Sequence, residues 1–151
     1  MIKILFVCHG NICRSPMAEF VMKDLVCKAG LEKNFYIESA ATSTEEIGND
    51  IHRGTRNKLI QMGIPFEKRA ARRITTGDYE KFDLLVGMDE ENLYYMNRAW
   101  NNDPKGKIRL LLEFAGKNRE VADPWYTGNF DQTYIDVLEG CKGILSSSKL
   151  N

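Results

Sequence analysis

The sequence predicts an α/β fold in which a four-stranded parallel sheet carries helices on both faces. Short apolar runs rich in β-branched residues alternate along the chain with longer stretches whose apolar residues recur at helical spacing. Strands that alternate with helices are typical of a parallel sheet, because each strand must reach its neighbour through a crossover. The chain has 151 residues, 43% of them hydrophobic, and this is enough for one domain spanning residues 1–151.

The N-terminal half begins with a strand at 2–7, where almost every residue is apolar. A helix follows at 16–29, and Pro16 suits its first turn because the missing N–H has no partner to lose there. A second strand is expected around 36–39, where apolar and polar residues alternate. The next helix is predicted at 50–62 from its spacing and from the glycine that follows it.

The C-terminal half continues the alternation. A short helix at 75–81 precedes an apolar strand at 84–86, and a helix at 89–97 precedes a strand at 108–111. The last helix, at 131–146, carries its apolar residues on one face. Right-handed crossovers place the loop after the first strand at the carboxyl edge of the sheet, where such folds bind ligands.

That loop is the most informative segment of the chain. A loop that ends at a helix N-terminus points backbone N–H groups into one concavity, and the helix dipole adds positive partial charge. Gly10 and Asn11 tolerate the left-handed backbone that such a tight wrap needs, and Arg14 is a two-pronged donor suited to phosphoryl oxygens. Cys8 then lies at the bottom of a phosphate-binding loop, where a thiolate is a nucleophile aimed at phosphorus. The loop reads Cys8-His9-Gly10-Asn11-Ile12-Cys13-Arg14-Ser15.

A second candidate segment, Asp123-Pro124-Trp125-Tyr126, lies far along the chain. By itself an Asp-Pro pair is more often a turn. If Cys8 forms a phosphocysteine, however, the group that leaves phosphorus needs a proton, and a carboxylic acid can supply it. The two aromatic residues could wall a pocket for a flat ring. Together with the Cys8 loop, the segment therefore favours Asp123 as a general acid.

The two segments together resemble the low-molecular-weight protein tyrosine phosphatase family. That family has Cys-x5-Arg-Ser near its N-terminus and an Asp-Pro pair near its C-terminus, and the resemblance runs from about Lys3 to Leu145. It implies a hydrolase that acts on phosphotyrosine and aryl phosphates through a phosphocysteine intermediate. In that reaction Cys8 is the nucleophile, Arg14 the phosphate clamp and Asp123 the general acid.

The expected substrate-binding residues come from the loop and the aromatic pair, and Ser39 is expected to support the loop. They are His9, Gly10, Asn11, Ile12, Cys13, Ser15, Trp125 and Tyr126. No metal and no other cofactor are expected, because Arg14 and the loop supply the charge that a metal would. The chain departs from the family at Glu45 and Glu46, where relatives often carry a bulky residue, and at Arg69, where they often carry histidine.

Composition limits the partners. Basic and acidic residues balance at 21 each, which argues against nucleic acid, and no apolar stretch approaches the length of a membrane span. We expect the first residues to belong to a core strand rather than to a signal peptide. We therefore expect a cytoplasmic enzyme whose partners are phosphotyrosine-containing proteins, with a monomer assumed.

Two other functions use the same loop. Arsenate reductases of related architecture need further cysteines to relay electrons by thiol–disulfide exchange, and the stretch 78–106 contains none. A non-catalytic phosphate-binding module is expected to lack the nucleophile or the acid.

Of the other cysteines, Cys27 and Cys141 are predicted to be buried in the core. Cys13 either packs beneath the loop or resolves an oxidised Cys8.

Overall fold

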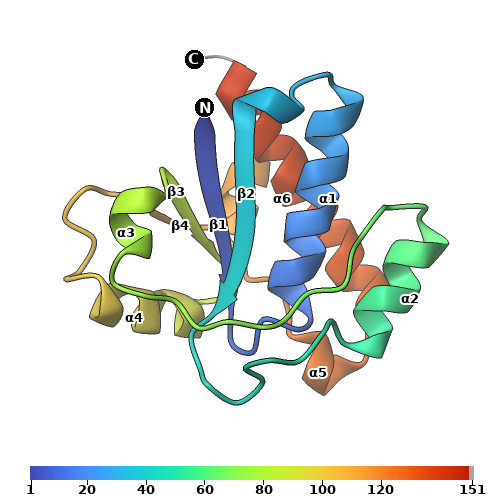
Figure 1. Cartoon of the computed structure of the whole chain (residues 1–151), viewed down its shortest axis with the longest axis horizontal. Coiled ribbons are helices and arrows are strands. Elements are labelled where there is room, and N and C mark those ends of the chain that lie inside the picture. The colour runs from blue at the N-terminus through green and yellow to red at the C-terminus, as the bar shows by residue number, and fades with distance from the viewer. Residues whose placement is uncertain (150–151) are drawn as a thin grey trace.

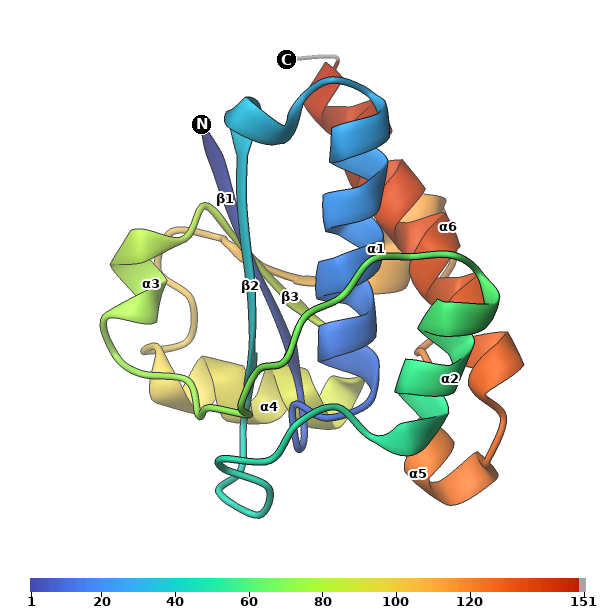
Figure 2. The ribbon, with the colours of Figure 1, turned by 45° about the vertical axis from the view of Figure 1, so that its right-hand side comes forward.

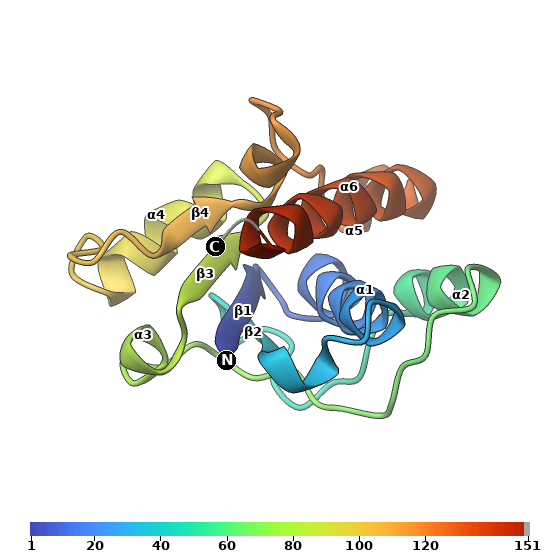
Figure 3. The same cartoon turned by 90° about the horizontal axis from the view of Figure 1, so that it is seen from above.

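The computed structural model describes residues 1–149, so the last two residues of the predicted domain lie outside the described residues. All four strands are parallel, in the order β2-β1-β3-β4. They are β1 (Ile2–Cys8), β2 (Phe35–Ala41), β3 (Leu84–Gly87) and β4 (Ile108–Leu110). Helices lie on both sides of the sheet (Figures 1 and 3). The predicted fold class is confirmed.

The helices divide between the two faces. On one face α1 (Arg14–Lys28) and α6 (Phe130–Lys149) pack side by side, with α2 (Arg53–Gln61) outside them (Figure 3). On the other face lie α3 (Asp78–Lys81) and α4 (Glu90–Ala99). Three short elements were not predicted: η1 (Glu32–Asn34), η2 (Leu111–Ala115) and α5 (Pro124–Thr127).

β1 lies inside the sheet, and its side chains are buried on both faces. Ile4 and Phe6 join the core beneath α1 and α6, whereas Leu5 and Val7 join the core beneath α3 and α4. A strand covered on both faces reads as a continuous apolar run. This double burial is the reason that the first strand is so easily recognised in the sequence.

Several boundaries differ from the sequence expectation. The helix predicted at 50–62 begins at Arg53 because His52 caps it, its Nδ1 accepting a hydrogen bond from the Gly54 N–H at 2.9 Å. The helix predicted at 75–81 begins at Asp78, whose carboxylate instead accepts from the Thr75 N–H at 2.8 Å and closes a turn.

The strands and the last helix also shift. The second strand is longer than 36–39, since it pairs with β1 along its whole length. The fourth strand stops before Leu111, which begins η2. The last helix extends beyond 131–146 at both ends.

The carboxyl ends of the strands point to one edge of the molecule. The loop 9–13, the teal segment after β2 and the orange helix α5 gather at this edge (Figures 1 and 2). Segments far apart in sequence therefore meet where parallel α/β folds bind ligands. Within residues 1–149, no helix has both the length and the apolar character needed to cross a bilayer.

Candidate active site

Cys8 is the last residue of β1, and its thiol is buried against the start of α1. The Ser15 N–H donates to Cys8 Sγ at 3.4 Å, and the Ser15 hydroxyl lies 3.0 Å from the same sulfur. That hydroxyl accepts a hydrogen bond from the side-chain amide of Asn11 at 2.8 Å. Its own proton can point at the sulfur at 3.0 Å or, over a longer 3.5 Å, at the backbone oxygen of Ala40. Two donors at a helix N-terminus therefore stabilise a Cys8 thiolate.

Asn11 holds the loop in shape. Its backbone is left-handed, with φ of 59°, as the sequence predicts for this position. Its side-chain amide donates to Ser15 and also to the Ser39 hydroxyl at 2.9 Å, and its side-chain oxygen accepts from the Arg72 N–H at 3.2 Å. All three polar contacts are buried or partly buried, so they fix the loop without exposing it to water.

Arg69 supports the loop from outside. Its guanidinium donates to the backbone oxygen of Asn11 at 2.5 Å and to that of Asn49 at 3.2 Å. Burial lowers the pKa of Arg69, and the charges of Glu19, Asp50 and Cys8 oppose that effect. Arg69 thus ties the phosphate-binding loop to the segment after β2 and brings a cation near Cys8.

Arg14 is almost fully buried, with its side chain 2% exposed. One terminal nitrogen donates to Asp89 at 2.7 Å and to the backbone oxygen of Val121 at 2.9 Å, and the other lies 3.4 Å from Asp123. Burial lowers its pKa, but the negative charges of Cys8, Asp89 and Asp123 raise it, and the net shift is upward. Arg14 is therefore a permanent cation in a fixed orientation.

Asp89 and Val121 are functional positions that sequence reasoning missed. Asp89 follows the carboxyl end of β3 and caps α4, where its other carboxylate oxygen accepts the Asn92 N–H at 2.8 Å. An aspartate between a strand and a helix at the ligand-binding edge was the available signal. Val121 contributes only its backbone oxygen, so its residue type carried no signal.

Asp123 lies at the N-terminus of α5. One carboxylate oxygen accepts the Trp125 N–H at 3.0 Å, and the other faces Arg14. Its side chain is 23% exposed and lines the same cavity as Cys8. The predicted nucleophile, cation and acid, from the two ends of the chain, therefore converge on one space.

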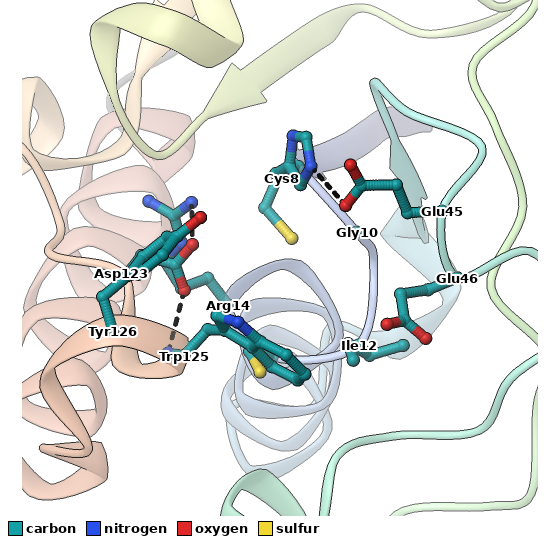
Figure 4. Close-up of a pocket in the computed structure, with 11 residues that line it drawn as sticks. Cys8, Gly10, Ile12, Arg14, Glu45, Glu46, Asp123, Trp125 and Tyr126 are labelled. Carbon is teal, nitrogen blue, oxygen red and sulfur yellow. Dashed lines mark hydrogen bonds and ion pairs between the residues drawn. The ribbon is translucent and has the colours of Figure 1, made fainter.

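That space is an open cavity of about 500 Å³, counting the solvent at its mouth. Asp123 and the aromatic residues lie on one side and two glutamates on the other (Figure 4). Asn11 and Ser15, grouped with the substrate-binding residues in the sequence, lie behind this lining, and Ser39 lies behind it too. The lining consists of Cys8, His9, Gly10, Ile12, Cys13, Arg14, Glu45, Glu46, Asp123, Trp125 and Tyr126.

Among the residues that the structure describes, one ring contact positions the aromatic wall. Trp125 meets His52 edge to face, with ring centroids 5.6 Å apart, and His52 stacks on Phe130 at 5.3 Å. Tyr126 is 83% exposed. Trp125 thus has a defined position beside the cavity, and Tyr126 has a surface available to a bound molecule.

Cys13 differs from Cys8 in its chemistry. Burial raises the pKa of Cys13 to about 12, and the charges of Cys8 and Asp123 add to the effect. Cys13 is therefore a neutral thiol at neutral pH. Of the two cysteines in the cavity, Cys8 is the one that receives hydrogen bonds from Ser15.

Comparison with known proteins agrees with this geometry. Residues 3–151 match the family model described as low molecular weight phosphotyrosine protein phosphatase. The chain is similar to the Bacillus subtilis low molecular weight protein-tyrosine-phosphatase YfkJ, with 39% identity over 97% of this chain and 96% of that protein. The crystal structure of YfkJ aligns with a TM-score of 0.95 and 38% identity, covering 99% of this chain and 95% of the other.

Two further solved structures are similar. A low molecular weight protein tyrosine phosphatase from Streptococcus pyogenes has 42% identity and a TM-score of 0.88, over 97% of this chain and 93% of its own. A Drosophila arginine phosphatase, DARP, has 33% identity and a TM-score of 0.88, over 98% of both chains. Relatives of this architecture thus carry names for two different phosphoamino acids.

Proposed function

The chain belongs to the low molecular weight phosphotyrosine protein phosphatase family, and from this premise we propose that Cys8, Arg14 and Asp123 hydrolyse phosphotyrosine in protein substrates. The observation that carries the proposal is the sulfur of Cys8, hydrogen-bonded by Ser15 in a cavity that Arg14 and Asp123 also line. A nucleophile, a phosphate clamp and an acid within one cavity are the parts that phosphoryl transfer to cysteine requires.

The reaction has two steps. In the first, Cys8 Sγ attacks phosphorus, the S–P bond forms, and the bond from phosphorus to the phenolic oxygen breaks while Asp123 donates a proton to that oxygen. Arg14 and the backbone N–H groups of residues 9–15 hold the other phosphoryl oxygens. In the second, the Asp123 carboxylate accepts a proton from water, whose oxygen attacks phosphorus. The S–P bond breaks, Cys8 returns as thiolate and inorganic phosphate leaves.

The cavity walls favour an aryl ester. Trp125 and Tyr126 offer flat surfaces on one side, and the side chain of Ile12 adds an apolar one. A phenyl ring can fill the space between them and still deliver its phosphate to Cys8. The short phosphoserine side chain would have to bring its backbone against the aromatic residues, and phosphoarginine would have to bury a charged guanidinium beside Ile12.

Arsenate reduction is not favoured by the positions of the remaining cysteines. Cys141 is buried in α6, as predicted. Cys27 was predicted to be buried but is exposed, because Val26 takes the inward-facing position in the last turn of α1. Neither cysteine lines the cavity, so neither is placed to relay electrons from Cys8.

We also propose that residues 1–151 act as one phosphatase domain in the cytoplasm. One sheet with a core on each face supports the single domain. A catalytic thiolate at Cys8 supports the location, because thiols stay reduced there. Light scattering that finds the mass of one chain would support the assumed monomer, and fluorescence microscopy of the tagged protein tests the location.

The decisive experiment compares three phosphopeptides of one sequence, carrying phosphotyrosine, phosphoserine or phosphoarginine. We expect hydrolysis of the phosphotyrosine peptide by far the fastest, and complete loss of turnover in Cys8→Ser with an unchanged circular dichroism spectrum. Cys27→Ser, at an exposed cysteine outside the cavity, is the matched control and should retain turnover. Comparable rates on either of the other two peptides would contradict the substrate assignment, and residual turnover above a few per cent in Cys8→Ser would contradict the nucleophile.

A further inference from the structure

We infer that the acidic rim of the cavity selects phosphotyrosines that lie next to lysine or arginine in the substrate protein. The acidic rim is defined as Glu45, Glu46 and Glu91. The inference rests on the proposed function, since it concerns which phosphotyrosines enter the same cavity. It is carried by two carboxylates in the cavity lining, those of Glu45 and Glu46, and a third, that of Glu91, beside His9; the site they border must bind an anion.

Glu46 is fixed against the phosphate-binding loop. A Cβ added at Gly10 would lie 3.3 Å from Cγ of Glu46, so the stem of this side chain lies over the glycine. Its carboxylate accepts a hydrogen bond from the side-chain amide of Asn49 at 2.6 Å. The negative charge of Glu46 is therefore held at the cavity wall opposite Asp123 (Figure 4).

Glu45 and Glu91 both lie beside His9, which lines the cavity. Glu45 lies 2.9 Å from His9 Nε2, and Glu91 lies 3.8 Å from His9 Nδ1. The side chains of Glu45 and Glu91 are 69% and 66% exposed. Both carboxylates are consequently open to a cation that arrives from solvent.

The positive charge of the lining is already committed. The guanidinium of Arg14 is buried and paired with Asp89 and Asp123. The chain as a whole is balanced at 21 acidic and 21 basic residues, so no net field of the molecule offsets the rim. A phosphate ester carries between one and two negative charges at neutral pH and meets repulsion from the rim as it enters.

A substrate cation reverses the sign of this interaction. When the phosphate lies at Cys8, the backbone of the phosphotyrosine lies at the mouth of the cavity, level with Glu45 and Glu46. Lysine and arginine have the longest cationic side chains, and from neighbouring positions they can reach these carboxylates. Exposed ion pairs contribute about 0.2–1 kcal/mol each, which corresponds to about 1.4- to 5-fold per pair in kcat/KM. Two pairs together give a preference of about 2- to 25-fold.

The test measures kcat/KM for two phosphotyrosine peptides that differ only at the flanking positions, lysine in one and glutamate in the other. We expect the wild type to prefer the lysine peptide about 10-fold at low salt. The preference should fall at least threefold in E45Q/E46Q, which keeps both side-chain stems, and also in 0.5 M salt. Glu32→Gln, at the opposite end of β2, is the matched control and should keep the wild-type preference.

Turnover of p-nitrophenyl phosphate adds a readout of opposite sign. This small substrate carries no cation, so removing the rim charges should raise its kcat/KM, and a fall would overturn the inference. Equal rates on the two peptides in the wild type, or a preference that survives in E45Q/E46Q, would also overturn it. Failure of the proposed function looks different, because the wild type would then hydrolyse neither phosphotyrosine peptide.

Discussion

At the residue scale, one carboxylate of this site makes contacts that compete with its chemistry. Asp123 caps α5 through the Trp125 N–H and pairs with Arg14. The same side chain is the proposed donor of a proton to the leaving group. The distance of 3.4 Å to Arg14 is at the long end for a charge-assisted hydrogen bond, so little free energy holds the carboxylate away from a bound ester.

Replacing Asp123 by asparagine tests that role. Asparagine caps a helix as well as aspartate does, so α5 should survive, but the amide cannot donate the catalytic proton. We expect kcat to fall about 10²- to 10⁴-fold on phenyl phosphate, whose leaving group is poor, and far less on p-nitrophenyl phosphate, whose leaving group needs no proton. An equal loss on both esters would mean that Asp123 is structural.

Arg69 offers a second test at this scale. Arg69→Gln removes the cation and weakens the hydrogen bond to the backbone of Asn11, so the left-handed loop loses a support that burial has made strong. We expect about a 10-fold loss in kcat/KM and weaker competitive inhibition by inorganic phosphate. Arg69→Lys should recover part of both, because it keeps the charge. Arg56→Gln is the control, because of the groups around Arg69 it is Asp50 that Arg56 contacts, at 4.0 Å. Equal losses in the two glutamine variants would contradict the role of Arg69.

The sequence could predict the residues that act close to one another along the chain. Cys8, Asn11, Arg14 and Ser15 lie within one loop and the first turn of one helix, so their spacing determines their geometry. The contacts of Arg14 with Asp89 and of Arg69 with Asn11 join residues 75 and 58 positions apart. Such contacts depend on tertiary packing, and the spacing of residues along the sequence does not reveal them.

At the element scale, the ends of the helices connect the scaffold to the chemistry. Asp89 caps α4 with one oxygen and holds Arg14 with the other, and Asn92 completes a capping box by bonding back to the Asp89 N–H at 3.2 Å. Helix α4 and the phosphate clamp therefore share one carboxylate. Because a boundary set by a cap depends on a single side chain, the sequence places helices more reliably than it places their first residues.

The two functions of Asp89 can be separated. Asp89→Asn keeps a good N-cap but removes the charge that orients Arg14, whereas Asp89→Ala removes both. We expect the asparagine variant to melt within a few degrees of the wild type while its kcat/KM falls at least 10-fold. The alanine variant should lose the same activity and also about 1 kcal/mol of stability. Full activity in Asp89→Asn would show that the Val121 oxygen and Asp123 are enough to hold Arg14.

Helix α6 packs closely because it contains glycine. A Cβ at Gly143 would lie 2.0 Å from the backbone oxygen of Phe114 in η2, and that backbone cannot rotate away as a side chain could. We expect Gly143→Ala to destabilise the fold by about 1–3 kcal/mol through overpacking, more than the roughly 1 kcal/mol that alanine gains in helix propensity. The measurement is the urea midpoint. Gly77→Ala is the matched control, because a Cβ there would lie 3.9 Å from the Thr75 hydroxyl and the backbone of Gly77 is already helical. Equal urea midpoints for the two variants would contradict the packing argument.

At the scale of the whole molecule, the order of strands and helices follows from apolar periodicity, and the site follows from the parallel topology. Both faces of β1 are buried from Ile4 to Cys8, so that run is apolar, and right-handed crossovers then leave few alternatives for the rest of the sheet. The short elements η1, η2 and α5 have three to five residues, too few to show a periodic pattern. They form because tertiary contacts position them, which is why the sequence did not predict them.

A network of charges links β2, α3 and the phosphate-binding loop. Arg72 pairs with both Glu38 and Asp78, and its backbone N–H supports Asn11. Burial raises the pKa of Glu38, but hydrogen bonds from Tyr36 and Lys81 and the charge of Arg72 lower it, and the net result is below the ordinary value of 4.5. The pKa of Asp103 is likewise lowered: its burial is outweighed by hydrogen bonds from Tyr79 and from the N–H groups of Ile108 and Lys107.

These lowered pKa values predict how the fold responds to acid. Because Glu38 is charged in the folded state at a pH where the unfolded chain has begun to bind a proton, the unfolded state binds more protons and stability decreases as the pH is lowered. The contribution of Glu38 is fully present well above pH 4.5, declines as the pH drops below that value, and is lost below the folded-state pKa. Glu38→Gln should therefore melt at a lower temperature than the wild type at pH 7, and the difference should shrink toward pH 3. Glu32→Gln is the control and should have the melting temperature of the wild type across the pH range. If the melting temperatures of Glu38→Gln and the wild type differ by the same amount from pH 7 to pH 3, then packing of the side chain, and not its charge, joins β2 to the loop.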